Sequence, residues 1–218
     1  MRAMILAAGR GERLRPLTDA TPKSLVEVRG ESLLERHLRN VQAAGIRTVV
    51  INLGWLGDRI VERVGSGERY GLDVIYSDEG DNILDTGGGI HKALPHLGDE
   101  PFLVVNADIY TDMPVPGVKL AAEHLGHLVM VPTPEYRDHG DFNIEGGLIR
   151  NGERAPYTFS GVAVYRPEFF DGCKSGRFSL VPMLREAADQ DRLSGALYEG
   201  LWADVGTPDR RAALRDSH

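Results

Sequence analysis

The chain contains only one cysteine, Cys173, among its 218 residues. A single thiol cannot form an internal disulfide, and zinc sites built from several cysteines are also excluded. We therefore expect a protein of a reducing compartment such as the cytoplasm, where thiols stay reduced.

Long apolar runs are missing as well. The longest apolar stretch without charge spans residues 48–57, whereas a membrane-spanning helix needs about 20 residues. The apolar run at residues 3–8 is too short for a secretory signal, and Arg10, Glu12 and Arg13 follow it at once. The sequence therefore predicts neither a membrane partner nor a targeting segment.

Basic residues are not in excess. The chain has 25 Lys and Arg residues and 32 Asp and Glu residues, which gives a formal net charge of −7. That balance argues against a broad nucleic-acid surface but leaves room for a local cationic cluster around a small anionic ligand. With 42% hydrophobic residues, the composition is that of an ordinary globular protein, and the length favours a single domain.

The first half of the chain alternates short apolar runs with helical patterns. Ser32, with Glu35 three residues later, predicts a capping box at the start of the first helix, and Gly45 predicts its end. This order predicts an α/β fold with a doubly wound, mostly parallel sheet and helices on both faces. Strands are expected at residues 3–7, 48–53, 72–76 and 102–105, and helices at 33–44, 56–64 and 90–97.

The second half is less regular. Strands are expected at residues 128–131 and 157–165, a hairpin turning at Gly146 and Gly147 within 141–150, and helices at 180–188 and 208–215. We expect this half to extend the same sheet and to form one wall of a cleft.

Unusual chemistry follows the first strand. Residues 6–18 read L-A-A-G-R-G-E-R-L-R-P-L-T. Glycines let a backbone approach a ligand, successive N–H groups can bind phosphate oxygens, and Arg10, Arg13 and Arg15 offer guanidinium groups. The stretch is neither a Walker P-loop nor a dinucleotide fingerprint. The alternative reading is a glycine-rich turn with solvated arginines.

A Thr21-Pro22-Lys23 corner comes next, and Pro22 favours an extended Thr21. The glycine loop followed by T-P-K resembles the sugar-1-phosphate nucleotidylyltransferases, at nearly every signature position and in the same order. The resemblance runs from residue 1 to about residue 207 and implies a Rossmann-like nucleotidyltransferase fold with a small sugar-binding lobe.

The resemblance also implies a metal. Asp108 follows the fourth strand, and Trp202-Ala203-Asp204-Val205-Gly206-Thr207 is similar to the family's W-x-D-x-G-T segment. The family binds Mg²⁺ at these two aspartates, and carboxylate oxygens suit such a hard cation. Each aspartate on its own would otherwise be read as a cap or turn residue.

Residues 84–90, L-D-T-G-G-G-I, occupy the place of the family's nucleoside-binding L-G-T-A-G segment. Asp85 and the triple glycine resemble the N-acetylmuramate-1-phosphate uridylyltransferases, as do residues 140–142 and 158–161. The family's Glu-Lys-Pro segment has only a partial counterpart at residues 153–156, so its role is not carried over.

The resemblance implies that UTP and N-acetylmuramate 1-phosphate give UDP-N-acetylmuramate and pyrophosphate, in the recycling of cell-wall sugars. The alternatives are a hexose-1-phosphate uridylyl- or guanylyltransferase, a phosphocholine cytidylyltransferase, or a catalytically silent nucleotide-sugar sensor. We expect a monomer, with residues 1–110 as the nucleotide-binding half and 111–218 as the sugar-binding half.

Site residues follow from the same resemblance. Asp85 either contacts the base or ribose, or caps the following helix. The expected catalytic residues are Arg13, Lys23 and Asp108; the nucleotide-binding residues are Ala8, Gly9, Gly11, Glu12, Arg13, Lys23, Asp85, Gly87 and Gly88; the sugar-binding residues are Asn106, Asp141, Ser160 and Gly161; and the Mg²⁺ ligands are Asp108 and Asp204.

Overall fold

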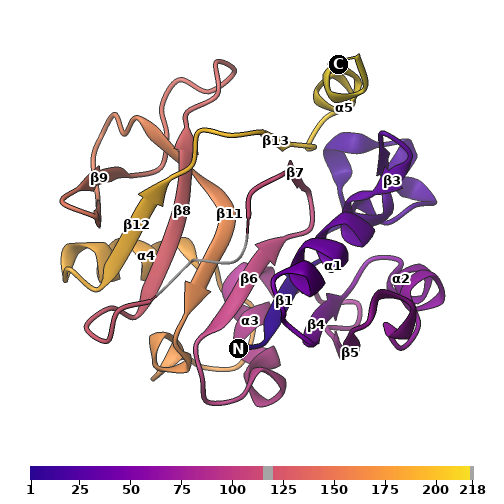
Figure 1. Cartoon of the computed structure of the whole chain (residues 1–218), viewed down its shortest axis with the longest axis horizontal. Helices are drawn as coiled ribbons and strands as arrows, with labels where there is room; N and C mark the ends of the chain where they lie inside the picture. The colour runs from indigo at the N-terminus through magenta and orange to yellow at the C-terminus, as the bar shows by residue number, and fades with distance from the viewer. Residues whose placement is uncertain (115–119, 217–218) are drawn as a thin grey trace.

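The computed structural model describes residues 1–114 and 120–216, so that residues 115–119 of the expected sugar-binding half lie outside the described part. Its centre is a nine-stranded sheet in the order β5-β4-β1-β6-β11-β8-β12-β10-β9 (Figure 1). The first four of these strands pair in parallel. Their bounds are β5 Asp73–Asp78, β4 Thr48–Leu53, β1 Ala3–Leu6 and β6 Phe102–Asn106.

The second half of the chain continues the same sheet. Only β11 and β10 run against the other seven strands, as the pairings require. The predicted mostly parallel sheet and its extension by the second half are therefore confirmed. The bounds are β11 Tyr157–Tyr165, β8 Gly126–Pro132, β12 Leu193–Leu197, β10 Leu148–Arg150 and β9 Asn143–Glu145.

Helices cover both faces of the sheet. Ile5 packs with Leu38 of α1 in one core cluster, and its neighbour Met4 packs with Ile90 of α3 in another. Successive residues of a strand point to opposite faces, so β1 is buried on both sides, as its continuous apolar run predicts. Helices α1 Leu33–Ala43 and α2 Gly57–Val64 lie on one face, and α3 Asp85–Leu97 and α4 Val181–Asp189 lie on the other (Figure 1).

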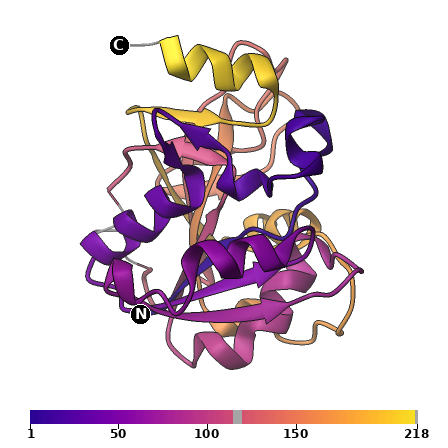
Figure 2. The ribbon, with the colours of Figure 1, turned by 90° about the vertical axis from the view of Figure 1, so that its right-hand side faces the viewer.

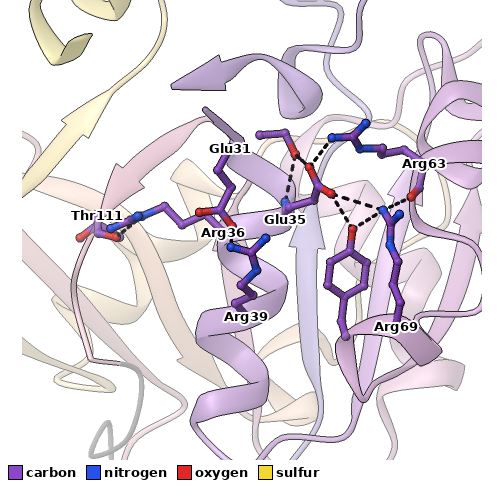
Figure 3. A network of polar contacts seen from close by, with 9 residues as sticks. Glu31, Glu35, Arg36, Arg39, Arg63, Arg69 and Thr111 are labelled. Carbon is purple, nitrogen blue, oxygen red and sulfur yellow. Dashed lines mark hydrogen bonds and ion pairs between the residues drawn. The ribbon is translucent and has the colours of Figure 1, made fainter. Parts of the chain in front are cut away.

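Helix α1 begins as predicted. The Ser32 Oγ accepts a hydrogen bond from the Glu35 backbone N–H at 3.3 Å and donates to Glu35 Oε2 at 2.7 Å. The buried Glu35 carboxylate also accepts from Arg63 at 2.9 Å, Tyr70 at 2.8 Å and Arg69 at 3.3 Å (Figure 3). One carboxylate thus ties α1 to α2 and to the segment that follows it.

The C-terminal segment returns to the N-terminal half. Strand β13 Trp202–Asp204 pairs antiparallel with β7 Ile109–Thr111, and α5 Pro208–Asp216 then packs beside the hairpin of β2 Glu27–Val28 and β3 Glu31–Ser32 (Figure 2). A third core cluster joins these parts through Val28, Leu33, Tyr110, Val205 and Leu214. The sequence patterns did not predict β2, β3, β7 or β12, and β12 is a strand of the central sheet.

Short 3-10 helices complete the fold, at Glu12–Leu14, Leu17–Asp19, Lys23–Leu25, Glu68–Tyr70 and Pro167–Phe170. Within the part of the chain that the structure describes, no helix combines the length and the apolar character needed to cross a membrane.

Candidate functional site

A cleft of about 400 Å³ opens at the carboxyl ends of β1, β4 and β6, where ligands bind in open α/β sheets. Its lining consists of Leu6, Ala7, Ala8, Gly9, Lys23, Ser24, Asn52, Glu79, Ile83, Asp85, Thr86, Asn106, Ala107, Asp108 and Arg177. The glycine loop, the T-P-K corner and Asp108 therefore meet in one place.

The glycine loop folds back onto the T-P-K corner at Gly11. This residue has φ +63°, and a Cβ there would lie 2.9 Å from Thr18 Cγ2 and 3.0 Å from Lys23 Cβ. The Thr18 hydroxyl donates to the Gly11 carbonyl at 2.8 Å. Only glycine combines this conformation with such close neighbours. Close packing thus explains why residue 11 is a glycine, and Gly11 does not line the cleft itself.

Among the remaining loop residues, Ala8 and Gly9 line the cleft, whereas Glu12 is exposed and lies outside its lining. The Ala8 carbonyl accepts a hydrogen bond from the Trp55 N–H at 3.3 Å, which ties the loop to the segment after β4. A Cβ at Gly9 would meet nothing within 4 Å, so its backbone is open to a ligand.

Lys23 and Asp108 form an ion pair inside the cleft. The Lys23 Nζ lies 2.5 Å from Asp108 Oδ2, and the two side chains are 13% and 34% exposed. Partial burial strengthens such a pair relative to one at the surface. Two of the three residues expected to be catalytic are thus in direct contact.

A buried histidine holds the segment after Asp108. Burial lowers the pKa of His37 to about 4, so the ring is neutral at neutral pH. Its Nε2–H donates to the Ile109 carbonyl at 3.0 Å, because a carbonyl can only accept. Sequence reasoning did not single out His37, although it lies on the apolar face of a predicted helix.

Arg13 and Asp204 meet outside this lining, around Gly206. A Cβ at Gly206 would lie 2.6 Å from Asp204 Oδ1, 3.1 Å from Arg13 Nη2 and 3.2 Å from Arg210 Nη1. Arg210, from α5, pairs with Asp204 at 2.7 Å, and its guanidinium carbon lies 3.8 Å from the ring centroid of Tyr136. Burial, followed by the charge of Asp204, raises the pKa of Tyr136. The arginine cluster at this end is suited to anions.

The donor set of the two aspartates fits a hard cation. Asp204 pairs with Ile109 across β13 and β7, and the Val205 N–H donates to the Asp108 carbonyl at 2.9 Å, so the two carboxylates come from adjacent positions. Asp204 Oδ1 is buried and accepts no hydrogen bond from any described residue. Among these residues no three acidic, histidine or cysteine side chains gather, so substrate phosphates would have to complete a Mg²⁺ shell.

Asp85 lines the cleft and has φ +63°. Its Oδ1 accepts from the Thr86 N–H at 2.6 Å and from the Thr86 hydroxyl at 3.3 Å. The carboxylate thus bonds only to the residue that follows it, and α3 has no side-chain capping bond, so the capping alternative is not supported. Contact with a base or ribose stays a prediction.

Gly87 and Gly88 face a loop of the second half. A Cβ at Gly88 would lie 2.2 Å from the Gly176 carbonyl oxygen, and a Cβ at Gly87 would lie 2.5 Å from the Phe178 ring. Neither residue lines the cleft. Close packing against this loop explains why both residues are glycines. Their contact with a nucleotide stays a prediction.

The four expected sugar-binding residues follow one another along β11, but only Asn106 is part of the cleft lining. Asn106 lines the cleft, and Gly161, with φ +83° at a bulge in β11, lies so close that a Cβ there would be 2.8 Å from Asn106 Nδ2. Ser160 is fully buried and accepts from the Val162 N–H at 3.1 Å. Asp141 accepts from Phe159 N–H at 2.9 Å and pairs with Arg137 at 3.1 Å. The side chains of Ser160 and Asp141 therefore already have hydrogen-bond partners within the protein.

Four polar residues of the lining escaped the sequence reasoning: Ser24, Asn52, Glu79 and Arg177. Asn52 is the last residue but one of β4, and Glu79 directly follows β5. Both therefore lie at the carboxyl ends of parallel strands, where ligands bind. Arg177 comes from the distant loop before α4 and forms no ion pair with any residue that the structure describes.

The sequence of this chain is similar to that of known proteins. The MobA-like NTP transferase domain matches residues 3–140. N-acetylmuramate alpha-1-phosphate uridylyltransferase from Neisseria meningitidis serogroup B is 47% identical over 95% of this chain and 94% of its own length. The enzyme of that name from Caulobacter vibrioides is 37% identical over 97% of this chain and 94% of its own length.

A solved structure shares the fold. The putative glucose-1-phosphate thymidylyltransferase from Bacillus anthracis superposes with a TM-score of 0.84 at 19% identity, covering 100% of this chain and 96% of its own. The chain combines a Rossmann-like fold, a cleft at the edge of the sheet where ligands bind, and extensive sequence identity to two uridylyltransferases. The chain thus belongs to the MobA-like NTP transferases and, among them, to the family of the N-acetylmuramate alpha-1-phosphate uridylyltransferases.

Proposed function

We propose that this protein transfers the uridylyl group of UTP to N-acetylmuramate 1-phosphate, forming UDP-N-acetylmuramate and pyrophosphate for the reuse of cell-wall sugars. The observation that carries the proposal is the Lys23–Asp108 pair, 2.5 Å apart, in the cleft beside the glycine loop. The substrates come from the relative that is 47% identical over 95% of the chain.

The reaction needs no general base, because the phosphate oxygen of the sugar phosphate is already anionic at neutral pH. This oxygen attacks the α-phosphorus of UTP, the bond to the bridging oxygen of the β-phosphate breaks, and pyrophosphate leaves with the electron pair. Positioning and charge neutralisation therefore supply the rate enhancement. Lys23 offsets negative charge on the transferred phosphoryl group, and Arg13 binds the leaving pyrophosphate.

Binding is divided between the walls of the cleft. The backbone of Ala8, Gly9, Gly11 and Glu12 holds the phosphates, the start of α3 at Asp85, Gly87 and Gly88 binds the nucleoside, and Asn106 contacts the sugar. Asp141, Ser160 and Gly161 support the sugar wall. In this scheme residues 1–110 bind the nucleotide and residues 111–218 the sugar, within a monomer of the cytoplasm.

Mg²⁺ is held by Asp108 and Asp204 in this proposal, with phosphate oxygens as further ligands. When bound, it supplies charge neutralisation at the reacting phosphates. The buried Asp204 Oδ1, without a donor among the described residues, supports such a ligand role.

Pyrophosphate release with a panel of nucleotides and sugar phosphates tests the proposal. UTP should exceed GTP by about tenfold or more in kcat/KM, because a site fitted to one ring must expand for two. Preference for GTP would instead identify a guanylyltransferase, and preference for CTP with phosphocholine a cytidylyltransferase. Binding without pyrophosphate release would identify a nucleotide-sugar sensor.

Asp108→Asn tests the metal assignment. We expect loss of metal-dependent turnover by about 10²-fold or more, while UTP binding without metal stays measurable by calorimetry, because the glycine loop and Arg13 remain. The calorimetric affinity for Mg²⁺ in the presence of UTP should also fall. An unchanged Mg²⁺ affinity would remove Asp108 from the ligand set.

A further inference from the structure

Asn52 and Glu79 form a buried polar pair in the lining of the cleft. They are 4% and 7% exposed, and neither has a role in the proposed reaction. Asn52 is the last residue but one of β4, and Glu79 directly follows β5. Both therefore lie at the edge of the sheet where ligands bind.

Three hydrogen bonds of equal length run through this pair. Asn52 Oδ1 accepts from the Ala7 N–H at 2.7 Å, and Asn52 Nδ2 donates to Glu79 Oε1 at 2.7 Å. Glu79 Oε2 accepts from the Leu84 N–H at 2.7 Å. Each side-chain atom faces one partner of the matching kind, which fixes the amide orientation of Asn52 as well.

Helix α3 presses on the pair from one side. A Cβ at Gly89 would lie 2.6 Å from Glu79 Oε1 and 3.1 Å from Asn52 Nδ2. Glycine at this position therefore makes room for the pair. The Glu79 carboxylate forms no ion pair with a described residue, so these hydrogen bonds are its compensation for burial.

The two ends of this chain of bonds lie in two separate segments that contribute to the cleft lining. Ala7 directly precedes the glycine loop, which is the proposed phosphate wall, and Leu84 directly precedes Asp85 and Thr86, which form the proposed nucleoside wall. The pair thus links the two walls by side-chain contacts that are independent of the backbone pairing within the sheet.

We propose that Asn52 and Glu79 are positioning residues that fix the separation of the phosphate and nucleoside walls and thereby restrict the site to a single-ring base. The inference rests on the proposed use of UTP. It differs from a purely stabilising role, because it predicts changes in nucleotide affinity and base preference at temperatures where every variant is folded.

Two single variants break the pair in different ways. Glu79→Gln leaves one oxygen for two donors, so either Leu84 N–H or the Asn52 amide then faces an NH₂ group. Asn52→Asp places a carboxylate against the Glu79 carboxylate. Each loses about one well-made buried hydrogen bond, and the loss of 1.4 kcal/mol corresponds to about a tenfold change in affinity.

The double variant Asn52→Asp with Glu79→Gln restores every bond. The new carboxylate at position 52 would accept from the Ala7 N–H and from the NH₂ group of the new amide at position 79. The oxygen of that amide would accept from the Leu84 N–H. The negative charge moves from one position to the other while the pattern of donors and acceptors is conserved. A thermodynamic cycle over the four proteins therefore isolates the coupling between the two positions.

The readouts are the UTP dissociation constant by calorimetry without sugar phosphate, the kcat and KM for UTP, and the UTP-to-GTP ratio of kcat/KM. We expect each single variant to weaken UTP binding and raise the KM about tenfold, to change kcat by less than about threefold, and to lower the UTP-to-GTP ratio. The double variant should recover to within about threefold of the original values. Glu62→Gln, an exposed change on α2, is the matched control and should leave every readout unchanged.

Single variants that melt at lower temperature but keep the UTP affinity and the base ratio would overturn the inference and leave a stabilising pair only. A double variant as weak as the singles would also overturn it. If the unmodified protein binds UTP but does not turn over N-acetylmuramate 1-phosphate, the substrate proposal fails alone, because the UTP dissociation constants still decide the role of the pair.

Discussion

Glu35 shows how one buried carboxylate is kept charged. Burial by itself would raise its pKa, but hydrogen bonds from Arg63, Ser32 and Tyr70 outweigh this effect and lower the pKa from 4.5 to about 2 (Figure 3). The charged form is therefore favoured in the folded state. Its contribution to stability is fully present above pH 4.5 and is lost as the pH falls towards 2.

Glu35→Gln should therefore lower the free energy of unfolding at pH 7 by roughly 2 kcal/mol, a figure that allows for the solvent screening of the half-exposed arginines. Urea denaturation at pH 7, 4 and 3 checks this expectation. The difference between the two proteins should shrink towards pH 3, and a difference independent of pH would contradict the linkage.

Tyr165 presents the opposite case, a buried hydroxyl without compensation. Its side chain is fully buried in an aromatic cluster, with the Phe169 ring centroid 5.1 Å away, and its oxygen has no hydrogen-bond partner among the described residues. Burial raises the pKa of this phenol.

Tyr165→Phe should therefore raise the free energy of unfolding by about 1 kcal/mol, because an unsatisfied polar atom is removed and the ring packing stays. Thermal or urea denaturation measures the change. A destabilisation of similar size would indicate that the hydroxyl has a partner such as a buried water molecule.

Arg13→Ala tests the proposed contact with the leaving pyrophosphate. Its side chain is exposed beside Gly206, so Arg13→Ala should leave the melting temperature unchanged. The kcat/KM should fall about 10²-fold, because a charge-assisted contact to the leaving group is lost. Arg39→Ala, which removes the surface pair with Glu31 at 2.7 Å, is the control, and equal activity of both variants would remove Arg13 from the proposed mechanism.

Among the elements, the start of α3 packs closely against the loop before α4. The Gly88 N–H donates to the Phe178 carbonyl at 3.1 Å, the Phe178 N–H donates to the Leu84 carbonyl at 3.1 Å, and the Leu180 N–H donates to the Thr86 hydroxyl at 3.3 Å. These bonds dock the loop before α4 on the helix, and the docked loop carries Arg177 into the cleft.

Gly88→Ala should displace that loop, because the new Cβ would lie 2.2 Å from the Gly176 carbonyl oxygen. Overpacking of this kind costs about 1–3 kcal/mol, so the melting temperature should fall. The KM for at least one substrate should also rise, because Arg177 moves with the loop. A normal melting temperature together with a normal KM would show that the loop adapts without cost.

At the scale of the whole molecule, the two halves of the chain are interlocked. Strand β6 of the first half pairs with β11 of the second, and β7 pairs with β13. The third core cluster draws Val28 and Leu33 from the N-terminal half and Val205 and Leu214 from the C-terminal segment. The two halves of the chain therefore share one framework.

Residues 1–110 expressed alone should therefore fail to fold cooperatively. Phe102 and Leu103 are fully buried in the whole chain, and the fragment would expose this edge of the sheet to solvent. Calorimetry and near-ultraviolet circular dichroism check the expectation. A sharp melting transition of the fragment would establish the first half as an independent domain.

Local patterns in the sequence determined most of the scaffold. Thr48–Leu53 and Tyr157–Tyr165 form strands with the predicted bounds, and Ser32 caps α1 as predicted. Apolar runs, helical spacing and caps depend on neighbours within a few residues, so they can be read directly. Asp108 directly follows the predicted fourth strand, so the rule for parallel sheets applies to it, and the structure pairs it there with Lys23.

Only the tertiary structure decided which distant segments touch. The sequence did not reveal that Gly88 makes room for Gly176, that Asn52 bonds to Glu79, or that Asp204 pairs with Arg210. The first contact joins residues far apart in the chain and leaves no periodic signal. The other two depend on the orientation of side chains at loop ends, which is set by packing from several elements together. For this protein the sequence determined most of the sheet, and the packing of the second half onto the first decided which groups face the cleft.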